Sequence, residues 1–408
     1  MEKSGRIGIF QYDWSMYSFI KVFIIKLAEA GYMVDVFQKD PNTSVVFADT
    51  EAFKVHSNIR YFTFSNSNTL AQISVRKFMG VLRRVSRKVA QNRISFIDSH
   101  ILRISKDIIR KSAYQCFIGI EKKGLIWAGC LAQTSRCPLI YYSLELYCED
   151  HPDIKEYSYL RKEEKRYHRR SLATIIQDKL RAQALLEYNE IANTNVIYFP
   201  ISVKGAIVKK KSDFFHRKYK LNKAMKVLLY FGLIQNERFS SDLVRMAGHM
   251  KGEKILVLHG YGDQAYLTHL RSTADRKRVI LSLELVPEEQ IVDIISSATI
   301  GLALYENSSS NDRLAAFSSV KVAYYLQCGV PIIAFYSESF RELVSAYKCG
   351  ELINSIDEIP KKAEMILQNY DNYVEQACLA FKQFYDYDCN FKKFIVDYDA
   401  LINDEDWA

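Results

Sequence analysis

A serine pair followed by a lysine is the part of the sequence best suited to holding an anion. Ser318 and Ser319 precede a predicted helix at 320–328, and Lys321 lies in its first turn. Hydroxyl side chains cap such helix starts, whose free backbone N–H groups attract phosphate. Arg238 follows a strand of the same half and could reach the same point with its forked N–H donors. Together they could stabilise a diphosphate without a metal; the alternative is a capped helix beside two surface cations.

Three acidic residues of the first half each follow a predicted strand. Glu145 is our first candidate for a general base, Glu121 the second and Asp13 the third. A carboxylate at such a strand end can take a proton from a hydroxyl group. Two of them also have a structural alternative, because Glu145 could cap or brace the next segment and Asp13 could cap the following helix.

The sequence offers no set of metal ligands. His, Cys, Asp and Glu residues show no metal-ligand spacing, and there is no Asp-x-Asp motif. We therefore expect no metal and no cofactor.

The elements that must position these residues follow an alternating pattern. Short β-branched or aromatic runs alternate with helical stretches, which is typical of open parallel α/β sheets. We predict two doubly wound Rossmann-like domains with a cleft between them: 1–200 for the acceptor, a linker at 201–224, and 225–369 for the donor. A helical tail at 370–408 is expected to cross back to the first domain. The predicted strands are 6–10, 33–38, 59–64, 114–120, 139–144, 173–177 and 195–199, then 226–231, 254–258, 278–283, 299–304 and 331–335.

Composition places the chain among ordinary globular proteins. Its 408 residues exceed what one core usually serves, and 49% of them are hydrophobic. The N-terminus shows no signal peptide, no apolar run is long enough to span a membrane, and the eight cysteines form no framework. We therefore expect a cytoplasmic protein with free thiols.

The net charge of +9 is unevenly placed. Residues 75–93 hold seven basic side chains and no acidic one, with apolar residues at near-helical spacing. This pattern favours a basic amphipathic helix, which could contact an anionic membrane or simply be solvated. Since no nucleic-acid-binding motif accompanies the charge, we predict no nucleic-acid partner.

Four segments of the second half add a family resemblance. In order, the segments at 226–238, 254–262, 285–302 and 318–334 resemble the C-terminal domain of GT-B fold glycosyltransferases, family 4 and its relatives. The resemblance implies a nucleotide diphosphate-sugar donor whose diphosphate meets Arg238 and Lys321. Gly232 would end the first strand beside it, and Ser318 and Ser319 would begin the helix.

The same resemblance implies places for the rest of the donor. The nucleobase would lie against the loop at 283–287, which includes Val286. His259 would line the crevice, or it is an ordinary hydrogen-bonded residue. Many family 4 enzymes carry a glutamate pair at positions that are Ala316 and Tyr324 here. A helix that begins with Ser-Ser-x-Lys and lacks this glutamate pair resembles the branch that contains the xanthan glucuronosyltransferase, which is inverting. Tyr324 could still contact the ribose through its hydroxyl.

The first half resembles these enzymes more faintly. Glu145 lies in Tyr-Tyr-Ser-Leu-Glu-Leu-Tyr, which resembles a His-Glu-Leu-Tyr-like segment of many GT-B relatives, and the run at 177–181 is also similar. We therefore predict a metal-independent glycosyltransferase acting on a glycan, a lipid-linked saccharide or a small-molecule acceptor. The alternatives are a GT-B-fold nucleotide-sugar epimerase and a non-catalytic pseudo-glycosyltransferase scaffold.

Overall fold

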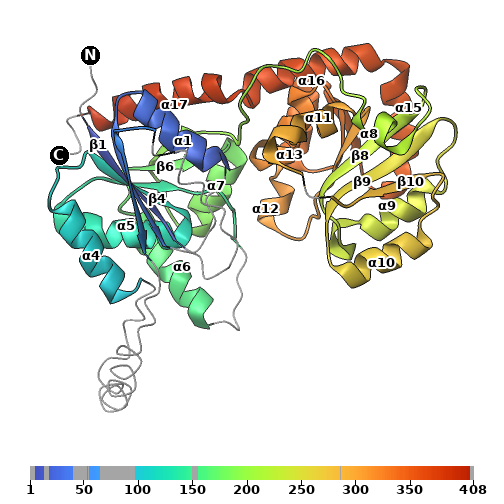
Figure 1. Ribbon diagram of the computed structural model, residues 1–408. Helices are drawn as coiled ribbons and strands as arrows, with labels where there is room; N and C mark the ends of the chain where they lie inside the picture. Colours follow the sequence, from blue (N-terminus) through green and yellow to red (C-terminus); the bar gives the residue numbers. More distant parts are fainter. Residues whose placement is uncertain are drawn as a thin grey trace.

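The computed structural model describes residues 5–12, 18–39, 53, 55–64, 97–148, 155–284 and 286–404. These residues form two α/β domains that lie side by side, with two long helices crossing from one to the other (Figure 1). Each domain is built on one parallel sheet, so the predicted fold class is confirmed. Asp13 and the basic segment at 75–93 lie outside the described residues.

The N-terminal sheet has the strand order β3-β2-β1-β4-β5-β6-β7 and is parallel throughout. Helix α1 packs on one face, while α4, α5, α6 and α7 supply the core of the other. The elements are β1 (Arg6–Gln11), α1 (Ser18–Glu29), β2 (Met33–Lys39), β3 (Ile59–Phe64), α4 (Ser99–Ile109), β4 (Cys116–Ile120), α5 (Glu121–Ser135), β5 (Leu139–Tyr142), α6 (Lys155–His168), β6 (Ala173–Ile176), α7 (Lys179–Tyr188) and β7 (Asn195–Tyr198).

The C-terminal sheet repeats this arrangement with the order β10-β9-β8-β11-β12-β13. Its strands are β8 (Lys226–Leu233), β9 (Lys254–Tyr261), β10 (Val279–Ser282), β11 (Ile300–Ala303), β12 (Ile332–Phe335) and β13 (Gly350–Ile353). Its helices are α8 (Phe214–Tyr219), α9 (Ser240–Ala247), α10 (Gln264–Thr273), α11 (Ile291–Ser296), α12 (Ser310–Arg313), α13 (Val320–Gln327), α14 (Glu338–Tyr347) and α15 (Ile359–Gln368), with short 3-10 turns η1 (Asn236–Arg238), η2 (Glu288–Gln290), η3 (Ala316–Ser318) and η4 (Ile356–Glu358).

Burial on both faces explains the near-continuous apolar runs of the central strands. In β8, the four residues from Val227 to Tyr230 are all buried. Helices α9, α10 and α15 cover one side of the sheet, and α8, α11 and α13 cover the other. Strand β13 was not predicted, since a four-residue edge strand of Gly-Glu-Leu-Ile gives too short a pattern. Helix α8, likewise, lies within the stretch that the sequence predicts as a linker.

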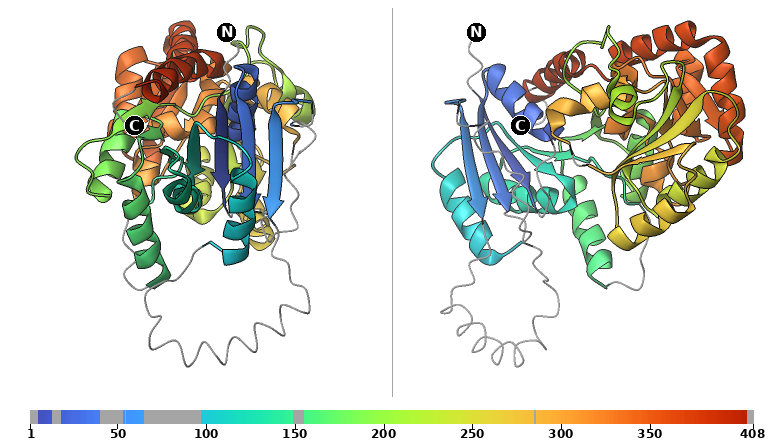
Figure 2. Two further views of the ribbon diagram at one scale, coloured as in Figure 1. Left: turned by 90° about the vertical axis from the view of Figure 1, so that its left-hand side faces the viewer. Right: turned by 45° about the vertical axis from the view of Figure 1, so that its right-hand side comes forward.

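Two helices at the end of the chain join the domains. Helix α16 (Tyr370–Phe384) packs on the C-terminal core, and α17 (Tyr387–Ile402) continues onto the N-terminal core (Figures 1 and 2). Asp386 marks the break between them, because its side chain accepts a hydrogen bond from the backbone N–H of Cys389 and so caps α17. Apolar side chains of α17 then pack beside α1, among them Phe394, whose ring lies 5.0 Å from that of Phe23.

Two further observations concern membrane-spanning helices and disulfide bonds. No helix in the described part of the chain combines the length and the apolar character needed to cross a bilayer. All eight cysteines are described, and all are free thiols.

Replacing Phe394 with alanine is expected to lower the free energy of unfolding by about 3 kcal/mol, because it leaves a cavity in an aromatic cluster. The ring is fully buried and contacts Phe23, Phe199 and Tyr398. Denaturant unfolding measures the change. Val396 on the same helix is 66% exposed, so Val396→Ala is the matched control and should have almost no effect. Equal losses in the two variants would contradict the packing of α17 as described.

Candidate functional site

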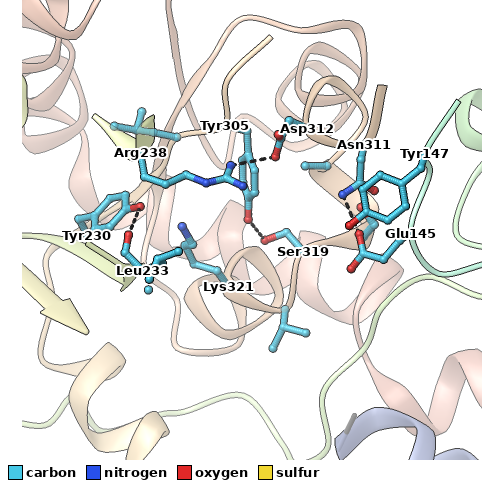
Figure 3. Close-up of a pocket in the computed structure, with 15 residues that line it drawn as sticks. Glu145, Tyr147, Tyr230, Leu233, Arg238, Tyr305, Asn311, Asp312, Ser319 and Lys321 are labelled. Atoms are coloured by element: carbon cyan, nitrogen blue, oxygen red, sulfur yellow. Dashed lines mark hydrogen bonds and ion pairs between the residues drawn. The ribbon is translucent and has the colours of Figure 1, made fainter. Parts of the chain in front are cut away.

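A cavity of ≈ 390 Å³ lies between the two domains (Figure 3). Its walls come from the segments that follow β5, β8 and β11, together with the start of α13. A cavity of this size is within the range of small-molecule sites. The predicted residues that line it are Glu145, Gly232, Arg238, Ser318, Ser319 and Lys321.

The strand order explains why the cavity forms here. Strands β8 and β11 are neighbours at which the connections turn to opposite sides, and ligands of open α/β sheets bind outside the carboxyl ends of such strands. Gly232, close to the end of β8, has a φ of +137°, which glycine adopts without strain. A Cβ atom at this position would lie 3.8 Å from Nζ of Lys321. The glycine therefore keeps the wall open beside the ammonium group.

Lys321 supplies one of two cations in the cavity. Its Nζ lies over the rings of Tyr230 and Tyr305, at 4.7 and 5.1 Å from their centroids. Such contacts stabilise the ammonium group only partly. Burial, reinforced by the charge of Arg238 and opposed by that of Asp312, lowers the pKa of Lys321 to about 8. The ammonium group is therefore charged at neutral pH and close to its titration range.

Arg238 supplies the second cation. It ends the 3-10 turn after β8, and its Nη1 donates a hydrogen bond of 3.0 Å to Oδ1 of Asp312. The Arg238 and Lys321 side chains both extend into the cavity (Figure 3). An anion placed between them would meet both cations and could replace Asp312 as the partner of Arg238.

The start of α13 completes this wall. Ser319 is its N-cap, and the side-chain oxygen accepts a hydrogen bond of 3.2 Å from the backbone N–H of Val322. The hydroxyls of Ser319 and Tyr305 also hydrogen-bond with each other. Ser318 makes a hydrogen bond to the other domain, since its Oγ accepts a bond of 3.0 Å from Nη1 of Arg181. The positive end of the helix dipole therefore faces the cavity beside Lys321.

Glu145 faces the cavity from the N-terminal domain. Its Oε2 accepts a hydrogen bond of 2.7 Å from Nδ2 of Asn311, a residue of α12 (Figure 3). A carboxylate from one domain thus lies across the cavity from the cations of the other. This is the arrangement that proton removal opposite an anionic leaving group requires.

Glu121 does not line the cavity. It is buried at the start of α5 and accepts hydrogen bonds of 2.8 Å from the backbone N–H groups of Leu144 and Glu145. Burial raises the pKa of Glu121 to about 8, with the charge of Glu145 adding to the rise and the two N–H donors opposing it. The structure therefore places Glu121 as a support for the segment that carries Glu145.

The remaining predicted residues lie away from the cavity lining. His259 is buried, its Nδ1 lies 2.9 Å from Oγ of Ser282, and its ring stacks on Phe231. Burial lowers the pKa of His259 to about 4, with the charge of Lys218 acting in the same direction, so the ring is neutral. Val286 and Tyr324 pack against the core beneath α11 and α13.

Sequence reasoning missed several residues of the lining, among them Tyr230, Tyr305, Asn311 and Asp312. Tyr305 follows β11, so the carboxyl end of that strand was a usable signal. Arg181 lies in a run that the sequence analysis noted, but its burial between the domains had no signal in the pattern. Within the described ranges, no group of three or more His, Cys, Asp and Glu side chains is placed to hold a metal ion.

Two parallel-sheet domains with a cleft between them are the arrangement of the GT-B fold. Comparisons with known proteins agree. Residues 244–394 match the family model described as the glucosyltransferase 3-like, C-terminal domain. No curated protein matches the chain in sequence. The chain thus has a GT-B fold, as the sequence predicts, and part of it matches a glycosyltransferase domain family.

Solved structures show the same fold along nearly the whole chain. HepE of Anabaena in complex with UDP is 13% identical, with a TM-score of 0.69, and the match covers 97% of this chain and 100% of that one. Sucrose-phosphate synthase of Thermosynechococcus elongatus is 12% identical, with a TM-score of 0.68 and coverages of 97% and 99%. The lipopolysaccharide outer core galactosyltransferase WaaB is 16% identical, with a TM-score of 0.59 and coverages of 96% and 99%.

The cations predict a binding experiment with inorganic pyrophosphate. Calorimetry should show an affinity that falls as the pH rises above about 8, because Lys321 then loses its charge. Lys321→Met should bind about ten- to a hundredfold more weakly at pH 7, the range expected for one charge-assisted hydrogen bond.

The titration of pyrophosphate itself is common to both proteins, so the ratio of their affinities isolates the lysine. This ratio should shrink toward one at high pH. Equal affinities at pH 7 would show that Lys321 does not hold the anion.

Proposed function

We propose that the protein is a glycosyltransferase that moves a sugar from a UDP-sugar to a hydroxyl group of an acceptor held by the N-terminal domain. One observation carries the proposal: Lys321 and Arg238 of one domain face Glu145 of the other across a single cavity. The structures of HepE with UDP and with UDP-glucose support a uridine nucleotide as the donor. The glucosyltransferase 3-like family match supports glucose as the sugar to test first.

The C-terminal domain would hold the donor and stabilise the leaving group. As the bond between the anomeric carbon and the diphosphate oxygen breaks, negative charge develops on the diphosphate. Lys321, Arg238 and the start of α13 line the same wall of the cavity, so they would stabilise this charge once Arg238 exchanges Asp312 for the diphosphate. Because two cations and a helix start line this wall of the cavity, we propose a reaction that needs no metal.

The N-terminal domain would activate the acceptor. Glu145 takes the proton of the acceptor hydroxyl while that oxygen forms a bond to the anomeric carbon. The proton ends on the carboxylate, and the electron pair of the broken bond leaves with UDP. Glu121 would help to position Glu145 for this step, since its carboxylate accepts a hydrogen bond from the backbone N–H of Glu145.

The positions of the missing glutamate pair favour an inverting reaction of the xanthan glucuronosyltransferase type over classical family 4. Ala316 is fully buried, and its backbone N–H donates to Oγ of Ser339. Tyr324 packs partly buried against the core. Neither position offers a carboxylate to the donor, so Glu145 is the acidic side chain that we assign to the reaction.

The acceptor proposed is a glycan, a lipid-linked saccharide or a small molecule met at the cytoplasmic face of a membrane. The seven basic residues of the segment at 75–93 support this location, because they would attract anionic lipid headgroups. A lipid-linked acceptor would then be presented beside the N-terminal domain.

Glu145→Gln is expected to reduce transfer from UDP-glucose, or its slow hydrolysis, at least about a hundredfold, because general-base catalysis contributes factors of this size. Release of UDP by the purified protein is the measurement. Glu375→Gln, an exposed change on α16, makes the same chemical substitution away from the cavity and should keep full turnover. Undiminished turnover in Glu145→Gln would show that Glu145 is not the general base.

The same incubation separates the alternatives. An epimerase would convert UDP-glucose into its epimer without an acceptor, which NMR detects. A scaffold would bind UDP and release no product from any donor tested. A transferase releases UDP and free or transferred sugar.

A further inference from the structure

Asn311 joins the two domains beside Glu145. It lies on α12, a one-turn helix between β11 and α13, and the hydrogen bonds of its side chain all go to residues of the N-terminal domain. Its Oδ1 accepts from the backbone N–H of Leu146 and from Nη2 of Arg181, both at 2.9 Å. Its Nδ2 donates to Oε2 of Glu145 at 2.7 Å.

The chemistry of these partners fixes which end of the amide faces which group. The N–H of Leu146 and the guanidinium of Arg181 can only donate, so the oxygen of Asn311 must face them. An ionised carboxylate can only accept, so the NH₂ group must face Glu145. The orientation of the amide therefore follows from its neighbours rather than from a choice between similar atoms.

We propose that Asn311 is a positioning residue that holds the Glu145 carboxylate aimed into the cavity. The inference rests on the proposed function, since it assigns a task to Asn311 in the same reaction. In the described part of the chain, no other side chain donates a hydrogen bond to Glu145. Without that bond the carboxylate could turn to other rotamers, and transfer of the acceptor proton would lose its geometry.

Helix α12 also connects the hydrogen bond between Asn311 and Glu145 to the donor-binding side of the cavity. Asp312, the next residue, pairs with Arg238, the cation that we assign to the diphosphate. Arg181 holds the same turn from the other domain through the backbone oxygens of Asn311 and Leu314, at 3.4 and 3.2 Å. One short helix thus links the donor-binding wall to the carboxylate that faces it.

The charged environment of Glu145 determines how a substitution at Asn311 will act. Acidic groups near it are Glu121 beneath its backbone and Asp312 on α12, and the buried guanidinium of Arg181 lies on the other side. Burial is the main cause that raises the pKa of Tyr305, and the negative charge of Glu145 also contributes to the rise. The cavity further contains Arg238, Lys321 and Tyr147.

Asn311→Asp is the variant that separates positioning from structure. Its carboxylate keeps both acceptor contacts, with Leu146 and Arg181, and therefore the contact between the domains. It replaces the NH₂ donor by an oxygen that repels Glu145. We expect the acidic limb of the pH–rate profile to move up by at least about one pH unit, because two adjacent carboxylates retain a shared proton to higher pH.

In UDP-glucose turnover, a shift of one pH unit makes kcat of the variant about tenfold lower than that of the wild type on the acidic limb. The ratio of the two kcat values should approach one as the pH rises above that limb. The KM for UDP-glucose should stay within about twofold of the wild type, because Lys321 and Arg238 are unchanged. Asn307→Asp is the matched control. This exposed residue of the same loop gains the same charge without contacting Glu145, so its pH profile should be that of the wild type.

A second variant tests the proposal if Asn311→Asp does not fold. Asn311→Gln keeps a neutral amide but displaces it by one methylene group, so kcat should fall at least about tenfold while the acidic limb stays in place. A wild-type pH profile in Asn311→Asp, or an unchanged kcat in Asn311→Gln, overturns the proposal. If Glu145→Gln is inactive in that case, the proposed function survives alone; if Glu145→Gln is fully active, both fail.

Discussion

The guanidinium group of Arg181 is buried between the two domains, and the site depends on how it is satisfied there. Burial lowers its pKa below the ordinary range for arginine, yet it stays charged because that range is so high. A buried charge costs several kcal/mol unless hydrogen bonds replace its water. Arg181 finds them in both domains: Gln177 and the backbone oxygen of Leu144 on one side, and Asn311, Leu314 and Ser318 on the other. Separation of the domains would break most of these bonds, so Arg181, together with Asn311 and the helices that join the domains, holds the halves of the cleft in place.

The charges of the cavity follow from that constraint. Arg181 holds the turn of α12, and α12 carries Asn311 toward Glu145 and Asp312 toward Arg238. Cations and a helix start therefore occupy one wall, and a carboxylate occupies the other. An uncharged sugar between a diphosphate and an acceptor hydroxyl fits this separation of charge, since its reaction releases an anion on one side and a proton on the other.

The sequence predicted the part of this account that depends on short stretches of chain. Alternating patterns located nearly every strand, and parallel strands place their carboxyl ends together, so Lys321, Arg238 and Glu145 could be assigned to one cleft. The task of Glu121 could not be predicted, because only the fold shows that its carboxylate turns back to brace the next strand end. Asn311 had no signal either, since its partner Glu145 lies 166 residues away in the chain. Contacts between domains decide such roles, and a pattern within one domain does not contain them.

The central claim is that one cleft holds the donor diphosphate against two cations and opposite one carboxylate. A crystal structure of the protein with UDP-glucose tests it most directly. The account predicts diphosphate oxygens within hydrogen-bond distance of Lys321 and Arg238, with Asp312 displaced from Arg238 and the anomeric carbon on the side of Glu145. A diphosphate bound elsewhere, with the ion pair between Arg238 and Asp312 intact, would contradict it.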